Sequence, residues 1–169
     1  AWLYSLEPMR LKRSAIFGPG IVAICYEGLP WFTGAAIFTV SLPSKEVLMV
    51  LTMYAFGAHG IMTLNDFKAT KGDKLLGVNS LPVILGRKPA TLVACLIMLF
   101  PQLVVMSLFY FWGSLILALT LAFCVLLQAS LMTFLMRDPE KNTRFFNMTG
   151  VLLYITGMML SANGLYLMN

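Results

Sequence analysis

Long apolar stretches alternate with short polar segments along this chain. Five of the apolar stretches are close to the roughly 20 residues that a helix needs to cross a bilayer. They run over 15–41, 46–64, 89–112, 114–136 and 145–167. Pro30 lies inside the first stretch, so we expect a kink or break in that helix. The pattern predicts an all-α, polytopic membrane bundle of about five transmembrane helices.

The composition agrees with a membrane protein. Of the 169 residues, 59% are hydrophobic and 11% are charged, whereas soluble domains are nearer half apolar and about a quarter charged. The apolar stretches are too long and too numerous for a secretory signal peptide. Cys25, Cys95 and Cys124 stand singly in apolar runs without metal-ligand spacing, so we interpret them as small buried residues. The chain begins at Ala1 in polar sequence, and we interpret it as a fragment of a longer polypeptide.

Positive charge lies almost entirely on one side of the predicted bundle. Five spans place segments 1–14, 65–88 and 137–144 together, and these hold eleven of the twelve lysines and arginines. Lys45 alone lies on the other side. Since cytoplasmic loops carry the excess of Lys and Arg, the basic segments are predicted to be cytoplasmic. We expect the lipid bilayer as a partner and no nucleic acid.

The most distinctive polar segment is 65–86, NDFKATKGDKLLGVNSLPVILG, between two apolar stretches. Asp66 and Asp73 are two helical turns apart, and Gly72 makes one continuous helix between them doubtful. Magnesium often binds one or two carboxylates plus substrate phosphate, and Lys68 and Lys74 are placed to neutralise diphosphate oxygens. The segment therefore predicts a site for a metal and a phosphorylated ligand. The alternative is a juxtamembrane loop whose lysines set topology and whose acids are counter-charges.

Three other groups are candidates for chemistry. Arg10 and Lys12, in YSLEPMRLKR, lie on the same side as Asp66 and Asp73, either as ligand-binding groups or as positive-inside anchors. Glu27 lies within the first span, where an ionisable residue is costly and usually faces a cavity or a partner. His59 is the only histidine, and a hydrogen bond between helices is the alternative to a chemical role.

Several motifs, in order, resemble one family. The run from Asn65 carries an ND pair, a second aspartate seven residues on, and SLPV at 80–83. It looks like the second aspartate-rich motif of the UbiA-type membrane prenyltransferases, and more narrowly like their bacteriochlorophyll and chlorophyll synthase branch. YSLEPMRLKR, CYEGLPWFTGAA, AHGIMTLNDF and NMTGVLLYITGMMLSA also read like this branch. The resemblance covers essentially the whole chain.

The resemblance implies a nine-helix fold of which this chain is the later half, so that 1–169 is the C-terminal part of a single domain. It implies esterification of the bacteriochlorophyllide propionate by geranylgeranyl or phytyl diphosphate, the last step of bacteriochlorophyll synthesis, with Mg²⁺ as cofactor. Asp66 and Asp73 are the implied metal-binding and catalytic residues. The implied diphosphate-binding residues are Arg10, Lys12, Asn65, Lys68 and Lys74. Tyr26, Glu27 and His59 are candidate acceptor-site or cavity residues.

One feature of the family is missing from this sequence. The family has another aspartate-rich motif in its first half, so we expect this chain alone to be inactive. Alternatives are a non-catalytic membrane subunit that holds pigment or bridges photosynthetic complexes, and a UbiA-type enzyme with a different acceptor. Expected partners include antenna or reaction-centre proteins, and the expected location is the inner or intracytoplasmic membrane of a photosynthetic bacterium.

Overall fold

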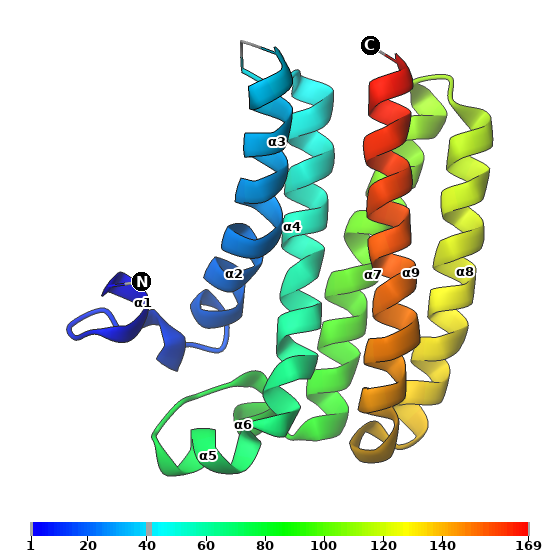
Figure 1. The fold of residues 1–169 in the computed structure, drawn as a ribbon. Coiled ribbons are helices and arrows are strands. Elements are labelled where there is room, and N and C mark those ends of the chain that lie inside the picture. The colour runs from blue at the N-terminus through cyan, green and yellow to red at the C-terminus, as the bar shows by residue number, and fades with distance from the viewer. Residues whose placement is uncertain (1, 40–41, 169) are drawn as a thin grey trace.

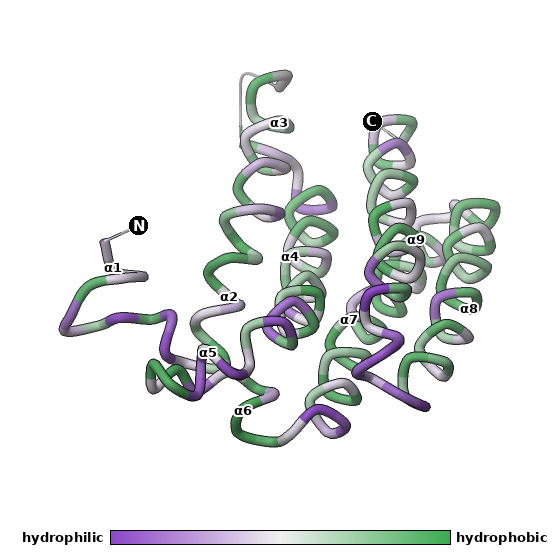
Figure 2. The backbone as a smooth tube through the Cα atoms, turned by 60° about the horizontal axis from the view of Figure 1, so that its bottom comes forward, coloured by the Kyte–Doolittle hydropathy of each residue, from purple (hydrophilic) through white to green (hydrophobic). Residues whose placement is uncertain are grey.

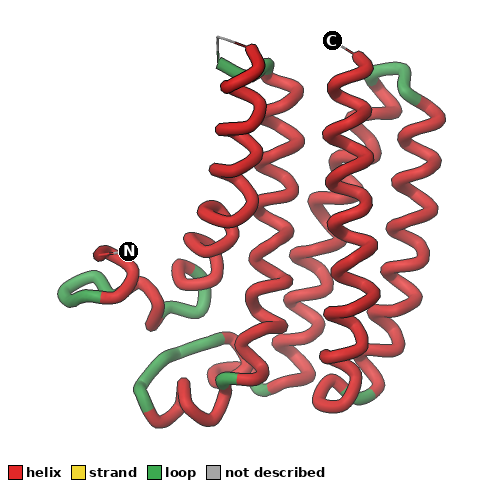
Figure 3. The backbone as a smooth tube through the Cα atoms, viewed as in Figure 1, coloured by secondary structure: helices red, strands yellow, loops and turns green. Residues whose placement is uncertain are grey.

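A computed structural model describes residues 2–39 and 42–168 of the chain. Within these ranges the elements are helices, with no strand, which confirms the all-α prediction (Figure 3). The α-helices are α1 Trp2–Ser5, α2 Phe17–Ala23, α3 Leu29–Thr39, α4 Lys45–Asn65, α5 Thr70–Leu75, α6 Leu81–Leu85, α7 Arg87–Phe111, α8 Leu115–Arg137 and α9 Pro139–Met168. The 3₁₀-helices are η1 Leu11–Arg13 and η3 Asp66–Lys68, and η2 Ile24–Gly28 is a π-helical turn.

The prediction of five spans is confirmed in number and approximate position. In the part of the chain that the structure describes, five helical segments are long and apolar enough to cross a membrane. They cover Phe17–Ile37, Lys45–Lys68, Arg87–Phe111, Leu115–Arg137 and Pro139–Met168.

The last helix begins six residues earlier than the apolar pattern predicts, at Pro139 instead of 145. Proline suits the first helical position, because its missing N–H has no partner there in any helix. Asp138 Oδ1 accepts a hydrogen bond from the Lys141 backbone N–H at 3.3 Å, and this bond lowers the pKa of the Asp138 carboxyl. The first turns of α9 are therefore capped and polar, and hydrophobicity alone does not detect them.

The distortion expected at Pro30 is a π-helical turn. Pro30 has no N–H to donate to the Tyr26 carbonyl one turn earlier, and its ring crowds that carbonyl. The wider turn of η2, just before Pro30, relieves this crowding. The result is a bent but continuous rod made of α2, η2 and α3 (Figure 1).

The bundle is built on α4 and α7. These two helices pack along most of their lengths, α7 also packs on α8, and α8 packs on α9, which reaches back to α4. Gly60 permits the close approach, because a Cβ there would collide with the Ala94 carbonyl and with Met98 of α7. The α2–η2–α3 rod packs on the outer edge of α4 (Figure 1).

The polar connections gather at one end of this bundle. α1, η1, α5, α6 and the start of α9 lie at the same end, and the C-terminus lies at the other (Figure 1). Viewed from that end, hydrophilic backbone positions are concentrated there, while the helices above are mainly apolar (Figure 2). The fold thus brings the segments predicted to face the cytoplasm to one surface.

Candidate functional site

A pocket of about 360 Å³ opens at this polar end, between the N-terminal segment and the connection that follows α4. Its floor and walls come from four parts of the chain: the N-terminal segment, the start of α2, the end of α4, and the α5–α6 connection. The lining residues are Tyr4, Arg10, Lys12, Ser14, Gly18, Pro19, Val22, Met62, Asn65, Asp66, Asp73, Leu76, Val78 and Ser80. Five of the seven residues predicted to bind metal or diphosphate are among them.

The two aspartates reach the pocket because the helix does not continue past α4. The α-helix ends at Asn65, η3 tightens the next turn, and α5 begins at Thr70. We expected Gly72 to make a continuous helix doubtful, and the interruption does exist, but it lies before Gly72, which is inside α5. Asp66 and Asp73 therefore face one pocket from two separate short helices.

Asp73 is fixed at both its backbone and its side chain. Its carbonyl accepts from the Val78 N–H at 2.8 Å, and its Oδ2 accepts from the hydroxyl of Ser80, also at 2.8 Å. One residue away from Ser80, the Asn79 N–H donates to the Arg13 carbonyl at 3.0 Å. The segment 78–80 consequently connects the aspartate to the basic N-terminal segment.

The basic side of the pocket is held by a local ion-pair cluster. Arg10 has a left-handed backbone conformation (φ 34°), which turns the chain toward η1. The Glu7 carboxylate lies 3.4 Å from Arg10 and 3.1 Å from Arg13. The Nε of Arg10 is buried and has no hydrogen-bond partner among the described residues. Arg10 thus lines the pocket while its guanidinium is paired with Glu7, and one of its N–H donors is left without a partner in the described part of the chain.

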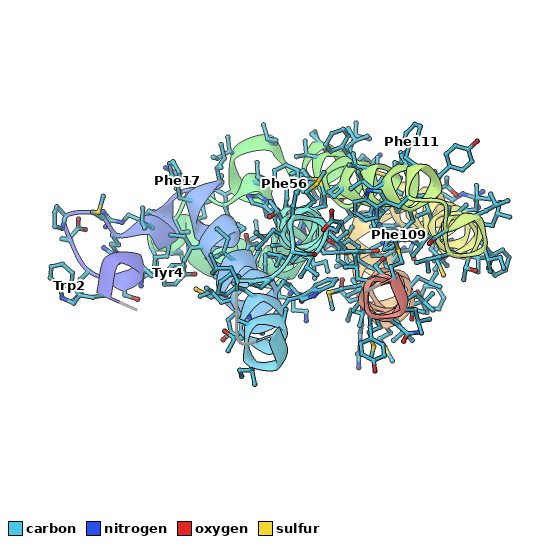
Figure 4. All side chains as sticks on the ribbon, turned by 90° about the horizontal axis from the view of Figure 1, so that it is seen from above. Trp2, Tyr4, Phe17, Phe56, Phe109 and Phe111 are labelled. Atoms are coloured by element: carbon cyan, nitrogen blue, oxygen red, sulfur yellow. The ribbon has the colours of Figure 1, made fainter. Side chains whose placement is uncertain are left out.

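Tyr4 is a pocket residue to which the sequence reasoning gave no chemical role. Its side chain turns from α1 toward the rest of the protein, whereas Trp2 points away (Figure 4). Burial raises the pKa of the Tyr4 phenol, and the negative charges of Asp66 and Asp73 raise it further. The phenol therefore stays protonated at neutral pH and is a hydrogen-bond donor beside the two carboxylates.

Asn65 is oriented from a distant part of the chain. The Nδ2 of Asn147, in the third turn of α9, donates to Asn65 Oδ1 at 3.3 Å. With its carbonyl occupied in this way, the Asn65 side chain has its amide N–H groups left for a ligand in the pocket. Asn147 was outside the predicted site, since 82 residues separate the two partners in sequence.

The remaining predicted residues lie elsewhere. Lys68 and Lys74 are exposed and do not line this pocket. Tyr26 and Glu27 are on η2, with Tyr26 exposed and Glu27 half-buried. Their proposed chemical roles stay predictions.

His59 makes a hydrogen bond from α4 to the turn just before α2, and its chemical role stays a prediction. Its Nε2 lies 3.1 Å from the Ile16 carbonyl, and since a carbonyl only accepts, Nε2 donates. Its Nδ1 lies 3.5 Å from the Thr63 hydroxyl. His59 also borders a separate, largely apolar pocket of about 450 Å³ between the α2–η2–α3 rod and α4.

The donor set of the polar pocket fits magnesium held jointly with a phosphorylated ligand. Two carboxylates face it, and no cluster of three or more His, Cys, Asp or Glu side chains occurs in the described residues. Two carboxylates suit Mg²⁺, which keeps several waters and commonly completes its coordination with substrate phosphate. Arg10, Lys12 and Tyr4 add donors suited to phosphate oxygens.

The UbiA prenyltransferase family matches residues 1–160, so the chain belongs to this family. This confirms the resemblance found in the motifs. The chain is 52% identical over 162 residues to the bacteriochlorophyll synthase 33 kDa chain of Cereibacter sphaeroides, covering 96% of this chain and 54% of that protein. It is 45% identical to the protein of the same name from Rhodobacter capsulatus, with the same coverages.

A third relative, the bacteriochlorophyll synthase 34 kDa chain of Chloroflexus aurantiacus, is 41% identical over 98% of this chain and 53% of its own length. The chain therefore spans about half the length of the curated relatives that it matches. No solved structure matches it.

Proposed function

We propose that the full-length protein esterifies the propionate of a bacteriochlorophyllide with a geranylgeranyl or phytyl group taken from the corresponding diphosphate. Residues 1–169 would form the C-terminal part of a single prenyltransferase domain. The observation that carries this proposal is the convergence of Asp66, Asp73, Arg10 and Lys12 on one pocket at the polar end of a UbiA-family bundle. The names of the bacteriochlorophyll synthase relatives support the choice of acceptor.

In the proposed reaction, the C–O bond between the prenyl C1 and the diphosphate breaks, and a propionate oxygen forms a new bond to C1. The products are the prenyl ester and free diphosphate. Asp66 and Asp73 would hold Mg²⁺, which when bound neutralises negative charge that accumulates on the leaving diphosphate. Arg10 and Lys12 contact the diphosphate oxygens, and Tyr4 donates a hydrogen bond beside them. Lys68 and Lys74, which are exposed, attract the anionic substrate over a longer range.

The pocket also has a polar and an apolar side. Pro19, Val22 and Met62, from α2 and α4, line it together with the charged groups. This arrangement suits a ligand with a charged head and a hydrocarbon chain. The apolar side excludes water from the allylic carbon, and water would otherwise convert the prenyl group to a free alcohol.

The decisive test is an esterification assay on the purified full-length protein. It is given bacteriochlorophyllide, geranylgeranyl diphosphate and Mg²⁺, and the pigments are separated by chromatography. We expect esterified pigment that is lost when EDTA removes the metal and restored when Mg²⁺ is added back. Folded, full-length protein that makes no ester under these conditions would support a pigment-holding subunit or a different acceptor instead.

We also propose that the polar end faces the cytoplasm, in the inner or intracytoplasmic membrane of a photosynthetic bacterium. The charge asymmetry supports this orientation. A tag placed after Asn169 should then lie on the periplasmic side and be digested by protease added to spheroplasts. Full protection of that tag, with a cytoplasmic control protein also protected, would contradict the orientation.

A further inference from the structure

Two serines, Ser14 and Ser80, are among the described residues that line the pocket. Of these two, only Ser80 has a hydroxyl that contacts a predicted metal ligand. It is 4% exposed, and its Oγ donates to Asp73 Oδ2 at 2.8 Å. A hydrogen bond from a hydroxyl to a carboxylate is charge-assisted and stronger than one between neutral groups. It uses one of the two carboxylate oxygens and leaves the other available to a cation.

The position of Ser80 in the fold makes this contact unusual. Ser80 is the N-cap residue of α6, where a serine hydroxyl normally accepts from a backbone N–H of the first turn. No such side-chain cap bond is present here. The backbone carbonyl of Ser80 accepts from the N–H groups of Val83 and Ile84, as an N-cap carbonyl does at the start of a helix.

Pro82 explains how the hydroxyl is released from capping. Pro82 is in the first turn of α6 and has no N–H. One of the two N–H groups that a capping hydroxyl would contact is therefore missing, and the Val83 N–H is bound to the Ser80 carbonyl. The rotamer that points to the helix loses its partners, and the rotamer that points to Asp73 is favoured. The order Ser-Leu-Pro-Val therefore favours the contact between the Ser80 hydroxyl and Asp73 in this fold.

The same segment fixes the position of Asp73 relative to the basic groups. The Val78 N–H holds the Asp73 carbonyl, and the Asn79 N–H holds the Arg13 carbonyl. Ser80 adds the bond to the carboxylate itself. Three consecutive residues therefore determine where the Asp73 side chain points and how far it lies from the N-terminal segment.

We propose that Ser80 is a positioning residue that orients the Asp73 carboxylate toward a divalent cation in the pocket. The role of Ser80 rests on the proposed function, because it requires Asp73 to bind that cation. Removal of groups that hold metal ligands typically lowers metal affinity by about 10–100-fold. Loss of the Ser80 hydroxyl should therefore weaken Mg²⁺ binding more than it weakens the fold.

The test uses the full-length protein in detergent, with Mg²⁺ titrated calorimetrically in the presence of geranylgeranyl thiodiphosphate, a poorly reactive substrate analogue. Ser80→Ala should raise the Kd for Mg²⁺ about tenfold or more, with a corresponding rise in the Mg²⁺ concentration for half-maximal activity. Ser80→Thr keeps a hydroxyl and should restore most of the affinity. Ser80→Cys keeps the size of the side chain but replaces the hydroxyl with a weak hydrogen-bond donor. It replaces the alanine variant in the same titration if that variant fails to fold.

Ser44 provides the matched control, because it is the N-cap of α4 and does use its hydroxyl for capping, accepting from the Val47 N–H at 3.4 Å. Ser44→Ala should lower the Tm without changing the Kd for Mg²⁺. If Ser80→Ala binds Mg²⁺ with wild-type affinity while Asp73→Asn binds it much more weakly, the role of Ser80 is overturned and the metal site of the proposed function stands. Unchanged Mg²⁺ affinity in Asp73→Asn would instead overturn the metal site of the proposed function.

Discussion

Two groups of polar side chains in this protein differ in what they contact. In the middle of the bundle, Tyr154 Oη donates to the Tyr54 carbonyl at 2.6 Å, and Tyr54 Oη lies 2.9 Å from Ser161 Oγ. Gln102 Nε2 donates to Gln128 Oε1 at 2.7 Å. These five residues, which we call the core polar cluster, are at most 3% exposed. Their polar groups bond to one another and to backbone carbonyls across four helices, although Gln128 Nε2 has no partner among the described residues. These bonds hold the helices together in an apolar surrounding.

At the polar end, by contrast, the side chains line a cavity and keep capacity for a ligand. Arg10 has a buried Nε without a partner among the described residues, and Asp66 and Asp73 face the same open space. Ser80, itself a lining residue, holds the Asp73 carboxylate, and Asn147 of α9 holds the side chain of Asn65, next to Asp66. The difference teaches that polar side chains bonded across the interior connect the helices of this fold, whereas those at the polar end line an open cavity.

The largest expected effect comes from removing a pocket charge. Asp73→Asn keeps the size of the side chain and an acceptor for the Ser80 hydroxyl but loses the negative charge that a cation requires. Removal of one group that stabilises transition-state charge typically lowers kcat by about 10²–10³-fold. The esterification assay on the full-length variant should show a loss of at least this size, with normal membrane insertion and Tm. Near-normal turnover in this variant would contradict the assignment of Asp73 to the metal site.

The next largest effect concerns stability rather than activity. Gly60→Val places carbon atoms where α4 meets the Ala94 carbonyl and the Met98 side chain, so the helices must separate. Overpacking of this kind typically costs about 1–3 kcal/mol, measurable as a lower free energy of unfolding in mixed detergent. Gly72→Ala is the control, because Gly72 lies in α5 with open space around it and should be neutral or slightly stabilising. Equal destabilisation by both variants would contradict the close contact at Gly60.

The smallest effect tests the orientation of Asn65. Asn147→Leu removes the donor that holds Asn65 Oδ1, so the Asn65 amide can rotate. A net hydrogen bond is worth about 1 kcal/mol, so the KM for prenyl diphosphate should rise by several-fold while kcat changes little. Asn147→Asp reverses the polarity of the contact and should have the larger effect of the two. Wild-type KM in both variants would show that Asn65 does not need Asn147.

Most of the fold could be predicted from the sequence, because the hydrophobicity of the residues along the chain directly identifies the helices that span a membrane. The five spans and the gathering of polar segments at one end follow from it. The early start of α9 could not be predicted in this way, since its first turns are polar and depend on the local chemistry of Asp138 and Pro139. The distortion near Pro30 was predicted, but not its form, because a proline can bend, break or widen a helix and here it is preceded by a π-helical turn.

The candidate site was predicted in part. Arg10, Lys12, Asn65, Asp66 and Asp73 do line one pocket. Spacing and residue type singled out the two aspartates, and the resemblance to the family added Arg10, Lys12 and Asn65. Lys68 and Lys74 could not be distinguished from these by charge, because whether a lysine faces a pocket depends on where the helix breaks. Asn147 depends on a tertiary contact between helices that are distant in sequence. Ser80 could have been found from its position two residues before Pro82.

The most direct test of the pocket is an experimental structure of the full-length protein with Mg²⁺ and geranylgeranyl thiodiphosphate. We predict that the diphosphate lies between Arg10 and the aspartates, that the metal contacts both Asp66 and Asp73, and that the prenyl chain extends past Met62. A well-ordered analogue bound elsewhere, with Asp66 and Asp73 facing solvent alone, would contradict the assignment of this pocket.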